Sequence, residues 1–274
     1  MKRIMAILNL TPDSFYPGSR LIRADGAFDA AAFVARVGTA LEQGADIIDL
    51  GACSTRPGSE PVSAEEEWRR LKPALERWKE HFRTVPLSVD TFRSEVALRC
   101  AEYSDRLIIN DVSAGDHLQM LDAVARMGCL YVAMHHQQLA PGDDVVASVC
   151  RWSEDFSRKA QETGIREWWL DPGFGFGKTL AQNWTLLRHL DLLPHERPIL
   201  VGLSRKSMLY KLLPPFTDAL PPGDATSRPA AADPATASAM ASRPETLLLT
   251  RLANRLALSG GASVFRVHDV SQVF

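Results

Sequence analysis

Short apolar runs recur along the chain, separated by longer stretches with helical periodicity. Several of these runs, such as IMAIL, LIIN and ILVGL, are continuously apolar rather than alternating. Continuous apolar runs are typical of strands in a parallel sheet that is covered on both faces. The pattern therefore predicts strands at residues 3–10, 45–51, 85–91, 107–112, 130–135, 167–171, 198–204 and 263–269.

The stretches between the runs carry helix signals. Residues 27–43 have helical periodicity, and Gly44 directly after them can supply a left-handed cap. Ser63 and Glu66 have the spacing of a capping box, in which each side chain bonds the other residue's backbone amide. Repeated alternation of strand and helix predicts a closed eight-stranded α/β barrel or a doubly wound open sheet, and we favour the barrel. Such a barrel takes about 250 residues, so the 274 residues are expected to form one domain, 1–274.

One stretch breaks this rhythm. Residues 213–244 read LPPFTDALPPGDATSRPAAADPATASAMASRP, which is dense in Pro and Ala and poor in large apolar side chains. A segment of this composition without a clear period is typical of a long flexible connection. We therefore expect an insertion after the seventh strand, and a surface excursion rather than a docking motif.

Composition narrows the class of protein. Lys and Arg total 31 against 33 Asp and Glu, so the formal net charge is −2, which argues against bulk binding of nucleic acid or of an anionic membrane. No run of about 18 apolar residues suggests a membrane span, and the N-terminal residues turn polar too soon for a signal peptide. The four cysteines are scattered without a CxxC pair, so we expect no disulfide framework or zinc site, and a cytoplasmic protein.

Polar side chains follow most of the predicted strands. In a parallel barrel, residues at the carboxyl ends of the strands lie around one mouth, where active sites are found. A single Asp after a strand is more often a turn former, but here nearly every strand ends in a polar group. Asp90, Asn110, Asp171 and Lys206 could together form a cage of two acceptors, one amide and one ammonium, which suits a flat heterocycle bearing amino, ring N–H and carbonyl groups.

A second group of strand-end residues is cationic. Arg205 and Lys206 follow the seventh predicted strand, and Arg266 and His268 come from the carboxyl half of the eighth, its neighbour in a barrel. Guanidinium forks match phosphate oxygens, and a helix starting after Ser204 would offer free backbone amides to an anion. The glycine-rich run 171–178 has neither of the spacings of nucleotide-binding loops, so we interpret it as a close-packed turn into a helix.

At these residues the sequence resembles the dihydropteroate synthase family, the folate-pathway enzymes that sulfonamides target. The matching segments occur in family order and cover nearly the whole chain outside 213–244. They are ILNLTPDSF (7–15), ADIIDLGACSTRPGSEPVSAEEE (45–67), LSVDTFRSEVA (87–97), IINDVSAG (108–115), YVAMH (131–135), LDPGFGFGKTLAQN (170–183), GLSRKS (202–207) and FRVHDV (265–270). The resemblance implies a (β/α)8 TIM barrel that joins 6-hydroxymethyl-7,8-dihydropterin diphosphate to 4-aminobenzoate, releasing pyrophosphate.

The resemblance also implies roles for individual residues. Catalysis would depend on Asp90, Lys206, Arg266 and His268. Asn9 would help to bind Mg²⁺ on the diphosphate, which Arg266 and His268 would grip. The pterin would lie among Asp90, Asn110, Met134, Asp171 and Lys206. The 4-aminobenzoate would be bound by Thr55, Arg56, Pro57, Phe176, Ser204 and Arg205.

The sequence departs from the family pattern in several places, two of which are at Cys53 and after the eighth strand. Cys53 stands where the family has an acidic residue or glutamine, and the chain reaches Phe274 shortly after the eighth strand, so we expect the helix that follows that strand to be missing or trivial. An apolar strip left exposed there would be covered by a homodimer or by the insertion. Two other functions stay open: a catalytically silent pterin-binding paralogue, and a methyltetrahydrofolate:corrinoid methyltransferase, which has no need of a diphosphate site.

Overall fold

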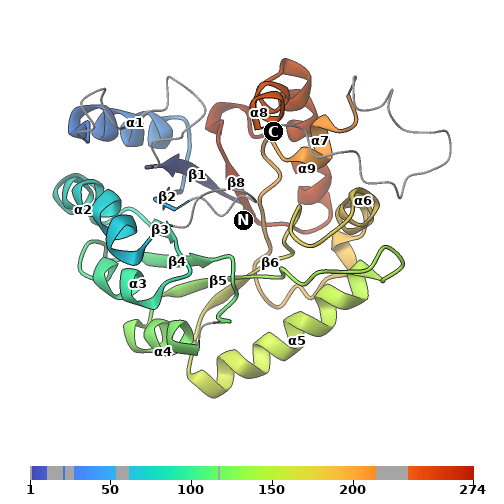
Figure 1. Ribbon diagram of the computed structural model, residues 1–274, viewed down its shortest axis with the longest axis horizontal. Coiled ribbons are helices and arrows are strands. Elements are labelled where there is room, and N and C mark those ends of the chain that lie inside the picture. The colour runs from blue at the N-terminus through green and yellow to red at the C-terminus, as the bar shows by residue number, and fades with distance from the viewer. Residues whose placement is uncertain (1, 11–20, 22–27, 54–61, 117, 214–233) are drawn as a thin grey trace.

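The computed structural model describes residues 2–10, 21, 28–53, 62–116, 118–213 and 234–274. In this part of the chain the strands gather in the middle of the molecule and the helices surround them (Figure 1). The predicted residues Thr55, Arg56 and Pro57 lie outside the described residues.

All the strands pair in parallel, as predicted. They form an eight-stranded sheet in the order β6-β5-β4-β3-β2-β1-β8-β7, and a single bridge between Leu170 and Ile199 joins the two edges into a nearly closed barrel. The fold is the predicted TIM barrel. The strands are β1 (Arg3–Asn9), β2 (Ile47–Gly51), β3 (Leu87–Asp90), β4 (Leu107–Asp111), β5 (Leu130–Met134), β6 (Trp168–Asp171), β7 (Leu200–Val201) and β8 (Val264–Val267).

Helices connect successive strands on the outside of the barrel (Figure 1). They are α1 (Ala30–Glu42), α2 (Ala64–His81), α3 (Ser94–Cys100), α4 (Leu118–Met127), α5 (Val145–Thr163), α6 (Leu180–Arg188), α7 (Ser207–Tyr210), α8 (Pro234–Ala241) and α9 (Pro244–Ser259), with the 3₁₀ turns η2 (Leu190–Leu192) and η4 (Val270–Gln272). Among the described helices, none is long and apolar enough to cross a membrane.

The predicted caps are confirmed in part. Helix α1 begins after Asp29, whose side chain accepts from the amide of Ala32, and Gly44 follows it with a φ of 99°. Ser63 caps α2 by accepting from the Glu66 amide at 3.2 Å. The reciprocal half of the predicted capping box is wrong, because the Glu66 carboxylate forms ion pairs with Arg69 and Arg70 instead. Two nearby guanidinium groups outcompete one backbone N–H for this carboxylate.

The barrel has two apolar cores. The larger core lies between the strands and the surrounding helices. The smaller one fills the barrel interior with one side chain from each of seven strands: Met5, Ile47, Ile108, Val132, Trp169, Leu200 and Val264. Because alternate residues of a strand share a face, the side chains two positions farther along face the same interior, nearer the carboxyl ends. The smaller core therefore forms an apolar floor beneath the mouth of the barrel.

The end of the chain and the region of the predicted insertion differ from a regular barrel. Residues 214–233 lie outside the described part, but α8 forms within the range expected to be a flexible insertion, and Met240 on it is buried. After β8 the chain forms the turn η4. The Phe274 ring packs edge-on against Phe265, with the ring centroids 4.9 Å apart, and Asn254 donates to the Val273 carbonyl.

An apolar strip is exposed on α9, the helix that precedes β8. Leu248, Leu252 and Leu256 repeat at the helical period and keep 55%, 52% and 39% of their surface exposed. The opposite face of α9 buries polar side chains, Thr246, Thr250 and Asn254 among them. Helix α9 therefore presents leucines to solvent while its buried face holds small and polar side chains, Ala253 and Ala257 beside the threonines and Asn254, unlike an ordinary surface helix.

Candidate active site

The residues directly above the apolar floor are mostly polar. Two positions beyond the interior side chains Ile47, Ile108, Val132, Trp169 and Val264 stand Asp49, Asn110, Met134, Asp171 and Arg266. Asp90 joins them from the end of β3, where it is in register with Gly51 and Asn110. The fold therefore brings the predicted cage residues of β3, β4 and β6 together with Arg266 of β8.

Arg266 is the centre of a charged network inside the mouth. Its Nε donates to Asp49 Oδ2 and its Nη2 to Asp90 Oδ2, both at 2.7 Å. The other oxygen of Asp49 accepts from Ser88 Oγ at 2.5 Å and from Asn110 Nδ2 at 3.5 Å. One guanidinium thus links side chains of four strands, β2, β3, β4 and β8.

Burial sets the protonation behaviour of this network. It raises the pKa of Asp90 to about 7, with Arg266 opposing the shift and Asp49 adding to it. Burial also raises the pKa of Asp171, although the hydrogen bond from the Gly173 amide and the charges of Lys206 and Lys178 act to lower it. Arg266 stays charged, because the two carboxylates outweigh its burial and raise its pKa. The mouth therefore holds two buried carboxyl groups with raised pKa values, of which Asp90 titrates near pH 7, beside a permanent cation.

The loop between β6 and α6 places Lys206 at the mouth. Lys206 Nζ donates to the Phe174 carbonyl at 2.6 Å and lies 4.3 Å from the centre of the Phe176 ring. At the start of the same loop, Asp171 Oδ1 accepts from the Gly173 amide at 2.8 Å. Predicted residues for both substrates, Asp171, Phe176 and Lys206, therefore lie around one loop.

The glycines of this loop permit its close approach to β5. Gly173 and Gly177 have φ values of 72° and 63°, and a Cβ on either would overlap a backbone carbonyl oxygen, that of His135 or Gln137. The interpretation of residues 171–178 as a close-packed turn is confirmed.

The Gly173→Ala variant is expected to destabilise the protein more than Gly128→Ala. Gly128 also has a positive φ, 62°, but has open space where a Cβ would stand. Gly128→Ala should cost about 1–2 kcal/mol for the left-handed backbone alone, while Gly173→Ala must also displace β5. Urea unfolding of both variants measures the two losses, and equal losses would contradict the close packing.

The cationic residues of the mouth do not all face one anion. Arg205 forms a forked ion pair with Asp269, at 3.0 and 2.7 Å. His268 Nδ1 lies 3.1 Å from Ser204 Oγ, which also accepts from the backbone amide of His268. The expected cluster is therefore divided: Arg266 lies inside the barrel, Arg205 is turned to Asp269, and His268 is held by Ser204.

The predicted helix start after Ser204 is wrong. Helix α7 begins at Ser207. The amide of Arg205 donates to Thr250 Oγ1 at 3.4 Å, and that of Lys206 donates to the Leu203 carbonyl at 3.1 Å. Arg205 itself has a φ of 59°, a rare conformation for a side-chain-bearing residue. A turn, rather than a helix N-terminus, therefore follows Ser204.

Asn9 lies at the carboxyl end of β1, in register with Gly51. A Cβ on Gly51 would stand 3.3 Å from Asn9 Oδ1 and 3.8 Å from Asp90 Oδ2. Glycine at position 51 thus lets an amide oxygen and a carboxylate oxygen approach the backbone of β2 closely. Oxygen donors of this kind suit Mg²⁺, which keeps waters and binds substrate phosphates with few protein ligands. In the described ranges no group of three or more His, Cys, Asp or Glu could hold a metal ion by itself.

His135 is buried at the end of β5. Its Nε2 lies 3.2 Å from Ser148 Oγ, and its ring meets Trp152 edge-on. Burial, assisted by the charge of Lys178, lowers the pKa of His135 to about 3. The folded protein therefore keeps this imidazole neutral where the unfolded chain, with a pKa near 6.5, takes up a proton.

The free energy of unfolding is consequently expected to depend on pH through His135. The contribution is fully present above pH 6.5 and is lost as the pH falls toward 3, by about 1.4 kcal/mol per pH unit. Urea unfolding of the unaltered protein and of His135→Gln between pH 7.5 and 4.5 measures it. The stability difference between the two proteins should shrink as the pH falls; parallel curves would show that His135 is not buried as a neutral ring.

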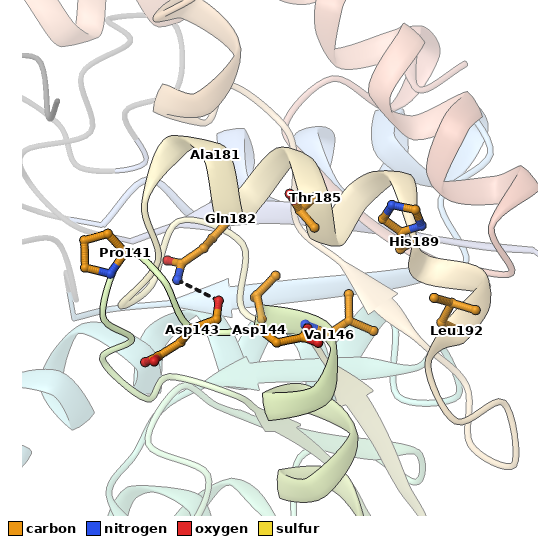
Figure 2. Close-up of a pocket in the computed structure, with 10 residues that line it drawn as sticks. Pro141, Asp143, Asp144, Val146, Ala181, Gln182, Thr185, His189 and Leu192 are labelled. Carbon is orange, nitrogen blue, oxygen red and sulfur yellow. Dashed lines mark hydrogen bonds between the residues drawn. The ribbon is translucent and has the colours of Figure 1, made fainter. Parts of the chain in front are cut away.

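A hollow of about 440 Å³ lies outside the barrel, between the start of α5 and α6 (Figure 2). Its polar groups serve local structure: Asp144 caps α5, and Gln182 belongs to the capping box of α6 and donates to the carbonyls of Ala140 and Asp143. None of the predicted site residues lines this hollow, which we interpret as a surface groove.

Sequence reasoning left two residues of the mouth without a role. Asp49 lies in the predicted strand 45–51 and Lys178 ends the glycine-rich run 171–178, and the sequence patterns assign neither residue a function. The available signal for Asp49 was its position two residues beyond the interior Ile47, the same spacing that places Arg266 beyond Val264. Lys178 carries no comparable signal, because its contacts depend on how the loop folds.

Comparisons with known proteins agree with this geometry. Residues 5–268 match the family model described as pterin binding enzyme. The dihydropteroate synthase of Neisseria meningitidis serogroup C is 36% identical over 98% of this chain and 88% of its own length. Among solved structures, the Clostridium difficile dihydropteroate synthase determined in the presence of pteroic acid is 30% identical, with a TM-score of 0.79 over 99% of this chain and 92% of that one.

The dihydropteroate synthase of Xanthomonas albilineans, solved with 4-aminobenzoic acid, is 38% identical, with a TM-score of 0.75 over 99% of this chain and 89% of that one. Family model, sequence relatives and solved structures each span most of the barrel, including the strands that carry Asp49, Asp90, Asp171 and Arg266. The chain belongs to the dihydropteroate synthase family of pterin-binding enzymes.

Proposed function

We propose that the protein condenses 6-hydroxymethyl-7,8-dihydropterin diphosphate with 4-aminobenzoate to give 7,8-dihydropteroate and pyrophosphate. The observation that carries this proposal is the polar ring of Asp90, Asn110, Asp171 and Arg266 above an apolar floor, in a chain 36% identical to a dihydropteroate synthase over 98% of its length. The floor limits how deep a flat ring can enter, and the polar ring supplies its hydrogen bonds.

In the reaction, the amine nitrogen of 4-aminobenzoate bonds to the pterin methylene carbon. The bond from that carbon to the diphosphate oxygen breaks, and its electron pair leaves with the pyrophosphate. The amine then gives one proton to water. An arylamine is neutral at pH 7 and needs no strong base, so positioning and charge stabilisation supply most of the catalysis.

The pterin lies among Asp90, Asn110, Asp171 and Lys206 in this proposal, with Met134 against the ring. Positive charge develops on the pterin as the leaving group departs, and the carboxylates of Asp90 and Asp171 stabilise it. The raised pKa of Asp90, about 7, allows this side chain to act as donor or acceptor toward the heterocycle.

The diphosphate is bound by Arg266 and His268. A guanidinium has five N–H donors, and Arg266 uses Nε and Nη2 toward Asp49 and Asp90. The remaining donors can receive the leaving group. Asn9 would hold Mg²⁺ on the diphosphate beside Gly51, and the bound cation would neutralise charge on the departing pyrophosphate.

The 4-aminobenzoate is bound by Phe176, Ser204 and Arg205, together with Thr55, Arg56 and Pro57 of the segment outside the described residues. The Phe176 ring lies beside Lys206, so the two substrates meet at this loop. A homodimer and a cytoplasmic location complete the proposal; the exposed leucines of α9 support the former, and the scattered free cysteines support the latter.

A substrate panel tests the assignment against its rivals. The protein is incubated with Mg²⁺, the pterin diphosphate and 4-aminobenzoate, and separately with 5-methyltetrahydrofolate and a corrinoid acceptor. We expect dihydropteroate from the first mixture and no methyl transfer in the second. Binding of the pterin diphosphate without product would identify a silent paralogue, and methyl transfer would identify the methyltransferase.

A further inference from the structure

Lys178 ends the loop between β6 and α6 with an unusual set of partners. Its Nζ donates to three backbone carbonyls: His135 at 3.0 Å, Gly173 at 3.0 Å and Phe176 at 3.1 Å. An ammonium group has three N–H donors, and all three are used here on main-chain oxygens. The side chain therefore acts as a clamp across the loop rather than as one half of an ion pair.

The three carbonyls come from two different elements. His135 directly follows β5, whereas Gly173 and Phe176 belong to the loop after β6. Further bonds run alongside the clamp, since the amide of Leu139 donates to the Gly177 carbonyl at 2.9 Å. Lys178 thus holds two parts of the loop together and also holds the loop against the residue that follows β5.

The clamped loop supplies the contacts that hold the mouth residues. The carbonyl of Phe174 receives Lys206 Nζ, and the Phe176 ring lies below the same ammonium group. Lys178 takes the carbonyl of Phe176 itself and that of Gly173, one residue before Phe174. A loop that relaxed at these positions would release Lys206.

We propose that Lys178 is a positioning residue of the reaction: its ammonium group shapes the loop that holds Lys206 and stabilises the carboxylate of Asp171. The inference rests on the proposed function and deepens it. Lys178 acts through the loop and through its charge, and touches neither substrate.

Charge supports this role as well as geometry. The charged groups that act on Asp171 are Lys178, Lys206 and Arg266, and each of them lowers its pKa against the effect of burial. Burial lowers the pKa of Lys178 to about 7, with Lys206 adding to the shift and Asp171 opposing it; His135 beside it stays neutral. A neutral amine has two N–H donors, so the clamp loses one carbonyl as the pH rises through this range.

The test compares Lys178→Met and Lys178→Arg with a matched control, Lys159→Met. Lys159 also ties a loop through an ammonium-to-carbonyl bond, to Gly115 at 3.2 Å, but it lies on α5, one of the outer helices, rather than in the loop between β6 and α6. For each protein the measurements are kcat and KM for both substrates from pH 5.5 to 9, the Kd of the pterin diphosphate by calorimetry, and the melting temperature.

We expect Lys178→Met to lower kcat/KM for the pterin diphosphate at least tenfold, with Lys159→Met within twofold of the unaltered protein. Lys178→Arg should keep most of the activity, and the decline of kcat/KM above pH 7 should move up by more than one pH unit, because arginine stays charged. Equal losses in Lys178→Met and Lys159→Met would overturn the inference. So would a Lys178→Arg pH profile identical to that of the unaltered protein.

The experiment still decides if a variant does not fold or if the unaltered protein is inactive. If Lys178→Met does not fold, as judged by circular dichroism, the pH profile of Lys178→Arg decides alone. If the proposed function is wrong, the unaltered protein makes no dihydropteroate. If only this inference is wrong, the unaltered protein is active and the Lys178 variants do not behave as expected. In an inactive protein, the Kd of the pterin diphosphate in Lys178→Met should still rise at least tenfold if the clamp shapes the pterin site.

Discussion

Replacing Arg266 with alanine is expected to lower the free energy of unfolding by about 3–5 kcal/mol, the cost of leaving buried charges without their partner. Arg266 bonds Asp49 and Asp90 at 2.7 Å, and the Asp49 side chain is completely buried. Without the guanidinium, both carboxylates repel each other in a poorly solvated interior. Urea denaturation followed by circular dichroism measures the loss.

The pH dependence of this loss identifies its cause. Burial already raises the pKa of Asp90, and removing Arg266 takes away the charge that opposes the shift. A folded-state pKa raised above the unfolded value makes stability fall as the pH rises through the window between the two. The deficit of Arg266→Ala should therefore be larger at pH 8 than at pH 6. Arg205→Ala is the matched control, because its partner Asp269 is 28% exposed and can rehydrate, so we expect a loss of about 1 kcal/mol. Equal deficits in the two variants would contradict the buried network.

Replacing Lys206 with alanine is expected to reduce kcat/KM about 10- to 150-fold. A charge-assisted hydrogen bond to a substrate contributes about 1.5–3 kcal/mol, and about 1.4 kcal/mol corresponds to a factor of ten. Lys206 is held against Phe174 and Phe176 at the mouth, so its loss should act on substrate rather than on the fold.

Steady-state kinetics with each substrate varied in turn gives the effect of Lys206→Ala. The control is Lys72→Ala, which removes a lysine that is 53% exposed and paired at 3.9 Å with Glu76 on the outer face of α2. We expect the control to keep full activity and both variants to melt within a few degrees of the unaltered protein. A Lys206→Ala enzyme within threefold of normal would remove this residue from the site.

The barrel was predictable because its strands are coded locally. Most of the strands are largely apolar in sequence, several of them continuously so, and all eight predicted runs contain an observed strand. Their ends were overextended, most of all at 198–204, where only Leu200–Val201 pairs regularly. The carboxyl ends leave the sheet to form the mouth, and apolar character alone does not reveal where hydrogen bonding stops.

Helix α8 escaped prediction for a related reason. Its sequence, PATASAMA, has helix-forming alanines but no apolar stripe, and it lies in a stretch rich in Pro. Periodicity therefore gives no helix signal, and Met240 becomes buried only in the folded protein, where α8 contacts α7 and α9. The half-formed capping box at Ser63 shows the same limit, since Arg69 and Arg70 are competing partners that the motif ignores.

The sequence predicts which residues lie at the candidate site, but it does not predict which of them form hydrogen bonds and ion pairs with one another. Asp90, Asn110, Asp171 and Arg266 follow from their places at strand ends. The pairing of Arg266 with Asp49 joins residues 217 positions apart. Asp269 accepts two bonds from the Arg205 guanidinium and so competes with any bound anion for that group. These partnerships are decided by barrel closure and by the turn after Ser204, which local sequence does not specify.

The most direct test of the central claim is a time course of both products in one reaction. The protein, Mg²⁺, the pterin diphosphate and 4-aminobenzoate are mixed, and dihydropteroate is measured by mass spectrometry while pyrophosphate is measured by a coupled enzyme assay. We predict that the two appear in equal amounts over many turnovers and that neither appears at this rate with Lys206→Ala. Pyrophosphate released without dihydropteroate, or no product from a protein that binds the pterin diphosphate, would contradict the assignment of this barrel mouth as a dihydropteroate synthase site.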